Sequence, residues 1–102
     1  MTTKKQYRKR VRRGIRLLEY YYGKDWYKDI SLKNLDMGEE CHCILGQLYG
    51  NYFDGSFQKG DEVAVDFCDL SPRFGFDISH DWPIVDSYNK LTKAWKKEIK
   101  KR

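Results

Sequence analysis

Apolar residues recur at every third or fourth position near both ends of the chain, with lysine and arginine between them. This spacing is typical of amphipathic helices that turn one side toward a protein core. It predicts a helix over residues 3–22, stopped by Gly23. It also predicts a helix beginning near Pro83, capped by Asp81 or Asp86. The apolar positions are Tyr7, Val11, Ile15, Leu18 and Tyr22 in the first helix and Ile84, Tyr88, Leu91, Trp95 and Ile99 in the second.

A third helix is predicted in the middle of the chain, over residues 40–53. Helical spacing would place a core stripe on one side and Cys43, Gly46 and Gly50 on another. Each glycine costs roughly 1 kcal/mol against alanine inside a helix, so a surface of small residues needs a compensating contact. Close packing against another helix is the common reason, and a ligand platform is the rarer alternative. The core stripe comprises Cys41, Ile44, Leu45, Leu48 and Tyr52.

Residues 62–70 fit either a strand or one face of a helix, because the run is too short to distinguish the two periods. Residues 73–78 are then either its hairpin partner or an aromatic loop that covers the core. The predicted fold is mainly α: a single domain over residues 1–102, with amphipathic terminal helices around a central glycine-containing helix. A small hairpin near 62–78 is the alternative.

Composition supports one small folded module. The chain has 102 residues, of which 40% are apolar and 16% aromatic, enough for a single core. No apolar run approaches the roughly 20 residues that span a bilayer, and the basic N-terminus lacks the apolar stretch of a signal peptide. Three cysteines, an odd number, argue against a disulfide scaffold. We therefore expect a cytoplasmic protein without membrane association.

Charge is distributed unevenly along the chain. Fifteen of the 20 basic residues lie before residue 19 or after residue 89, where Glu98 is the only acid. The stretch between carries the other fourteen acids and five basic residues, a net charge of −9. Such asymmetry predicts either a polyanionic partner for the two ends or ends that fold back over the acidic middle.

The Cys41-His42-Cys43 triplet raises the question of a metal site. Structural zinc sites favour two or more residues between paired cysteines, whereas here there is one. On a helix the two thiols would also point in nearly opposite directions. A site that joins one of them to Cys68, His42 and His80 is the alternative. Buried cysteines without metal are favoured, since free cysteine behaves as a small hydrophobe.

No residue pattern predicts catalysis. Cys43 has His42 beside it, but neighbours on a helix diverge by about 100° and do not readily share a hydrogen bond. His80 with Asp77 or Asp81 resembles an acid–base pair, although a loop histidine among aspartates is usually a solvated surface residue. The chain has no phosphate-binding glycine loop and no serine nucleophile motif. We predict a non-enzyme, with no catalytic residue, metal or cofactor.

Three segments resemble a family of small proteins from bacteriophages and from prophages of Gram-positive bacteria. They are CHCILGQLYGNY at 41–52, GFD at 75–77 and YNKLTKAW at 88–95. The central motif of that family is similar to Cys-x-Cys-Val/Ile-Leu-Gly-Gln-Leu-Tyr-Gly-Asp/Asn-Tyr, and the similarity extends roughly over residues 14–95. The resemblance implies a phage or prophage accessory protein, acting in the host cytoplasm, and it implies no particular activity.

Two functions follow as hypotheses. The first is binding of nucleic acid, or of a host nucleoprotein complex, by the basic sides of the terminal helices, with tyrosines such as Tyr20 available to stack on bases. The second is binding of a small molecule, a nucleotide or a host protein by the small-residue surface. A homo-oligomer formed through the tyrosine-rich first helix is a further expectation. The predicted nucleic-acid-binding residues are Lys5, Arg8, Lys9, Arg12, Arg13, Arg16, Lys93, Lys97 and Lys100, and the alternative ligand-binding residues are Cys43, Gly46, Gln47, Gly50 and Asn51.

Overall fold

A computed structural model of the chain describes residues 3–50, 56–57, 65–66, 72–78 and 81–102. The first element is the helix α1, Lys4–Tyr21, which confirms the predicted N-terminal helix. Its start is fixed by a capping box: the Thr3 hydroxyl accepts a hydrogen bond from the Gln6 N–H, and the Gln6 side chain accepts one from the Thr3 N–H. The predicted apolar positions from Tyr7 to Leu18 are buried.

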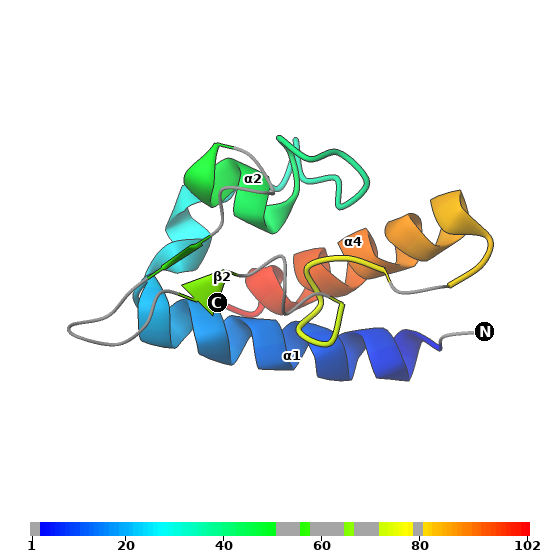
Figure 1. Ribbon diagram of the computed structural model, residues 1–102, viewed down its shortest axis with the longest axis horizontal. Helices are drawn as coiled ribbons and strands as arrows, with labels where there is room; N and C mark the ends of the chain where they lie inside the picture. Colours follow the sequence, from blue (N-terminus) through cyan, green and yellow to red (C-terminus); the bar gives the residue numbers. More distant parts are fainter. Residues whose placement is uncertain (1–2, 51–55, 58–64, 67–71, 79–80) are drawn as a thin grey trace.

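The C-terminal helix is α4, Ile84–Lys100. It runs in the same direction as α1 and packs against it, so the two ends of the chain form one layer (Figure 1). The predicted caps are wrong: Pro83 occupies the N-cap position without a side-chain hydrogen bond. Asp81 instead bonds to α1, and Asp86 forms an ion pair within the first turns of α4.

The apolar side of α4 is shorter than the periodicity predicts. Leu91, Trp95 and Ile99 are buried, whereas Ile84 is 49% exposed. The ring of Trp95 lies at the centre of the core, where its Nε1–H donates a hydrogen bond of 2.6 Å to the Gly75 carbonyl. Its neighbours are the stacked ring of Phe76 and the perpendicular ring of Trp26, each with a centroid distance of 5.8 Å.

The described part of the middle segment is less helical than predicted. A short 3₁₀-helix η1, Trp26–Asp29, follows α1. The helix α2 spans Ile44–Tyr49 and ends at Gly50; of the predicted helix over 40–53, residues 51–53 lie outside the described residues. Residues preceding α2 form turns, in which the N–H groups of His42 and Cys43 bond to the Glu39 carbonyl. α2 packs beside η1 and lies over the α1–α4 pair rather than between its members (Figure 1).

The two described strands are β1, Ser56–Phe57, and β2, Val65–Asp66, paired antiparallel. The predicted hairpin between 62–70 and 73–78 is therefore wrong in its pairing, because β2 pairs with a segment that precedes it. Residues 72–78 form turns and bring Phe76, fully buried, onto Trp95. The alternative prediction, an aromatic loop that covers the core, is confirmed for this segment.

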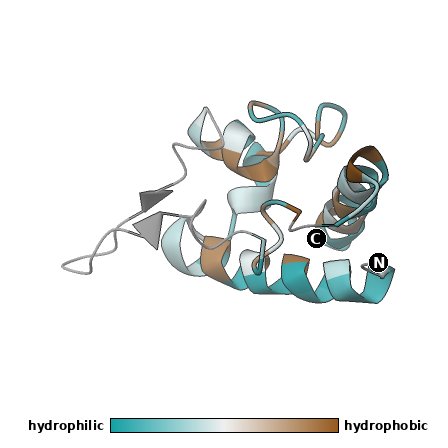
Figure 2. Cartoon of the chain, turned by 45° about the vertical axis from the view of Figure 1, so that its right-hand side comes forward, coloured by the Kyte–Doolittle hydropathy of each residue, from teal (hydrophilic) through white to brown (hydrophobic). Residues whose placement is uncertain are grey.

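The described residues thus form a mainly helical domain, as predicted. Its apolar residues gather between the helices, and the polar residues of α1 lie on its outer side (Figure 2). None of the helices in the described part of the chain combines the length and apolar character needed to cross a bilayer.

Candidate functional site

A groove of about 330 Å³ runs between the first half of α1 and the length of α4. It exists because the two helices lie side by side with their apolar sides turned into the core, which leaves long polar side chains along the seam. Its lining is Lys4 and Arg8 from α1, with Asp86, Asn89, Lys90, Lys93, Ala94, Lys97 and Glu98 from α4.

The groove is strongly cationic. Five basic and two acidic side chains line it, a net formal charge of +3. Both acids have basic partners: Asp86 lies 3.0 Å from the Lys90 ammonium, and the buried Glu98 lies 3.5 Å from Arg12 and from Lys101. Among the described residues, no ion pair involves Lys4, Arg8, Lys93 or Lys97.

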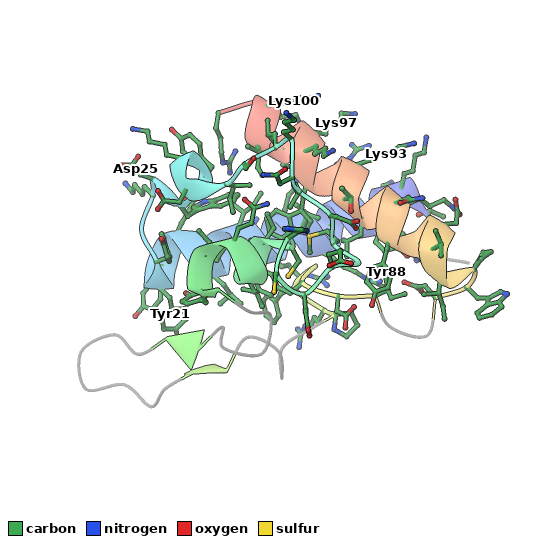
Figure 3. The ribbon with its side chains drawn as sticks, turned by 90° about the horizontal axis from the view of Figure 1, so that it is seen from above. Tyr21, Asp25, Tyr88, Lys93, Lys97 and Lys100 are labelled. Carbon is green, nitrogen blue, oxygen red and sulfur yellow. The ribbon has the colours of Figure 1, made fainter. Side chains whose placement is uncertain are left out.

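The structure brings together only part of the predicted nucleic-acid-binding set. Arg8, Lys93 and Lys97 line the groove. Arg12 does not line it but forms an ion pair with Glu98, which does. Lys93, Lys97 and Lys100 project from one side of α4 (Figure 3). The other predicted residues on α1 are exposed outside the groove: Lys5, Lys9, Arg13 and Arg16.

Two groove residues, Lys4 and Lys90, were missed as site residues by sequence reasoning. Both belong to the basic end segments, but their membership depends on how α1 and α4 are placed beside each other. Arg10, which the charge pattern groups with the other basic residues, lies on another side of α1. There its guanidinium is 3.2 Å from Asp81, and the same carboxylate accepts a 2.8 Å hydrogen bond from the Tyr7 hydroxyl.

The alternative ligand surface is not formed. Cys43 and Gly46 are buried, and a Cβ atom at Gly46 would collide with the Glu40 carbonyl oxygen. Gly50 terminates α2 in the left-handed conformation, φ +90°, instead of lying within the helix. Asn51 lies outside the described residues.

The amide of Gln47 is occupied by structural bonds. Its Oε1 accepts from the Ser31 N–H at 2.6 Å, and its Nε2 donates to the Ser31 and His42 carbonyls. Gln47 therefore bridges the loop after η1 to α2, and its polar atoms are engaged within the protein rather than directed at a ligand.

The two described cysteines differ. Cys43 is buried at the N-cap of α2, where its sulfur accepts a hydrogen bond from the Gly46 N–H at 3.3 Å. Burial raises the pKa of the Cys43 thiol despite this bond, so the thiol stays protonated at neutral pH. Cys41 is exposed, which corrects its predicted place in the core stripe.

The alternative metal site and the alternative acid–base pair both include residues outside the described part of the chain, Cys68 and His80. Among the residues that are described, no three cysteine, histidine or acidic side chains gather into a metal-binding cluster. Asp77 accepts a 2.7 Å hydrogen bond from the Tyr88 hydroxyl, and Asp81 is bonded to α1.

Comparison of the sequence and structure with family models, curated proteins and solved structures found no match.

Proposed function

We propose that this protein is a non-enzymatic nucleic-acid-binding protein that holds the phosphate backbone in the groove between α1 and α4. The observation that carries the proposal is the convergence of Lys4, Arg8, Lys93 and Lys97, cations from opposite ends of the chain, on one groove without acidic partners among the described residues. Like charges held close together repel one another, and a polyanion relieves that repulsion while releasing its own counterions.

In the part of the chain that the structure describes, ion pairs between the basic ends and the acidic middle involve few of the basic residues. Among the described residues, three ion pairs join a basic end to an acid between residues 19 and 89. Their basic members are Arg10, Lys90 and Arg102. Lys4, Arg8, Lys93 and Lys97, which form no ion pair with a described residue, can therefore contact a partner.

The proposal is tested by fluorescence anisotropy with labelled DNA and RNA over a range of salt concentrations. Four phosphate contacts predict that log Kobs falls with log salt with a slope of about −3 for a single strand. A triple variant that neutralises the groove should reduce the magnitude of this slope by about 2 and weaken binding to all sequences alike. The groove variant carries Arg8→Gln, Lys93→Gln and Lys97→Gln; the charge-matched control carries Lys24→Gln, Lys28→Gln and Lys33→Gln, all exposed positions away from the groove.

Absence of binding at low salt, or binding that does not depend on salt, would refute nucleic-acid binding. An equal effect of the groove variant and its control would refute the assignment of the groove. The resemblance to phage and prophage proteins adds a proposed setting, in which this face engages a host nucleoprotein complex in the cytoplasm. Capture from host lysate should then be lost when the lysate is treated with nuclease.

A further inference from the structure

The first turn of α4 and the residues before it carry apolar side chains into solvent. Trp82 is 71% exposed, Ile84 49% and Val85 73%, whereas the other two tryptophans of the chain are fully buried. The hydrophobic colour of this turn contrasts with the hydrophilic first half of α1 (Figure 2). Neighbouring apolar side chains exposed together, unlike single scattered ones, mark an interaction site.

Trp82 lies two residues before α4, the helix that forms one side of the cationic groove. Asp86 and Asn89, which line the groove, lie in the first two turns of the helix that Trp82 precedes. On its other side, Asp81 is tied to α1 by Tyr7 and Arg10. The backbone on both sides of the tryptophan is therefore held in place.

Acidic neighbours do not repel an anion at this end of the molecule. Asp81 lies 3.2 Å from the Arg10 guanidinium, and Asp86 lies 3.0 Å from the Lys90 ammonium. Both carboxylates next to the exposed apolar residues are thus compensated by cations. Among the described residues, a polyanion that extends from the groove past the start of α4 meets Asp81 and Asp86 already paired with cations.

We infer that the protein prefers single-stranded nucleic acid, with the backbone in the α1–α4 groove and an unpaired base stacked on Trp82. This inference rests on the proposed function and specifies its substrate. In a duplex the faces of the bases are covered by their neighbours, so an exposed indole has nothing to stack on. An unpaired base offers a π-face of any sequence.

The groove also has the shape of a site for a single chain. Its cations lie in a concave seam, which a flat lipid surface does not enter. From Asp86 to Lys97 the groove follows α4 for about 16 Å, at 1.5 Å per residue. A strand stacked as in B-form DNA rises about 3.4 Å per nucleotide along its axis, so about five stacked nucleotides match this length.

Intrinsic fluorescence tests the inference, because Trp82 is the exposed tryptophan while Trp26 and Trp95 are buried. Oligothymidylate should quench the emission of the wild type, and the quench should vanish in Trp82→Phe, which retains a ring and most of the affinity. Trp82→Ala should weaken binding of the oligothymidylate roughly tenfold or more, since a stacked base contributes strongly to affinity. Its salt dependence should match that of the wild type, because no phosphate contact is removed.

A blunt duplex of the same length and vesicles of anionic phospholipid complete the experiment. Equal affinity for duplex and single strand, with Trp82→Ala weakening neither, overturns the inference and leaves the proposed function standing. Quenching by the vesicles but not by oligothymidylate overturns it in favour of a membrane surface. Failure of every nucleic acid to bind removes the proposed function as well. Thermal melting checks that Trp82→Ala is folded like the wild type. If the alanine variant is less stable, the loss of quenching in Trp82→Phe tests stacking independently of folding.

Discussion

Replacing Gly46 with alanine should destabilise the protein, although alanine is the better helix former by about 1 kcal/mol. A Cβ atom at this position would overlap the Glu40 carbonyl oxygen and lie 2.7 and 2.8 Å from the carbonyl carbon and Cα of Cys41. These are backbone atoms of the turn before α2, which is held by hydrogen bonds to the Glu39 carbonyl. They cannot yield as a side chain would.

The sign of the stability change depends on whether the cost of overpacking exceeds the gain in helix propensity. Overpacking a fixed environment costs about 1–3 kcal/mol, and the closeness of this backbone points to the upper end. After subtraction of the helix propensity gain, the expected loss is about 2 kcal/mol, which lowers Tm by roughly 8–16 °C in a domain of this size. Urea titration and thermal melting followed by circular dichroism measure both quantities.

Gly50→Ala is the matched comparison at the other end of α2. No atom of the described residues lies within 4 Å of a Cβ there, so the cost of the substitution is the backbone strain of the left-handed conformation, about 1–2 kcal/mol. Gly50→Asn should recover part of this loss, because asparagine tolerates that conformation. A Gly46→Ala protein as stable as the wild type would show that the turn does not press on α2, and the reasoning would fail.

Two further predictions concern a helix start and a buried phenol. Thr3→Ala removes the capping box of α1 and should cost about 1 kcal/mol in the urea-derived free energy of unfolding, with Thr3→Ser close to the wild type; equal stability of the alanine variant contradicts the cap. Burial, with the nearby Tyr22, raises the pKa of Tyr49 from 10.0 to about 12. Between these values the unfolded chain binds fewer protons than the folded one, so stability should fall as pH rises from 10 to 12, and fall less in Tyr49→Phe. Identical pH profiles of the two proteins in urea titrations would contradict it.

Long periodic segments were predictable from the sequence. The residues of α1 and α4 repeat one pattern over four or more turns, so their ends were placed within a residue or two. The sequence pattern predicts the middle helix less well. Cysteine is an uncommon helix cap, so the pattern does not show that α2 begins after Cys43. Helical spacing suggests a packing role for Gly50, whereas its positive φ ends the helix.

The groove could not be derived from periodicity, because two amphipathic helices pack their apolar sides equally well in parallel or antiparallel directions. The direction decides which cations meet: it brings Arg8 beside Lys93 and Lys97 and leaves Arg13 outside. The exposure of Trp82 could not be predicted from the sequence either. A tryptophan beside a helix start is normally assigned to the core, and burial of the other two tryptophans depends on contacts distant in sequence.

The pairing of α1 with α4 bears on how the chain folds as it is made. Residues 22–83 separate the two helices, so α1 leaves the ribosome long before the helix that covers it. Until α4 follows, Val11 and Leu18 lack the partners Leu91 and Trp95 that complete their core. A nascent chain that stops before α4 exposes the apolar side of α1, while the opposite side of α1 is cationic. Such a chain is expected to bind chaperones or to be degraded by proteases.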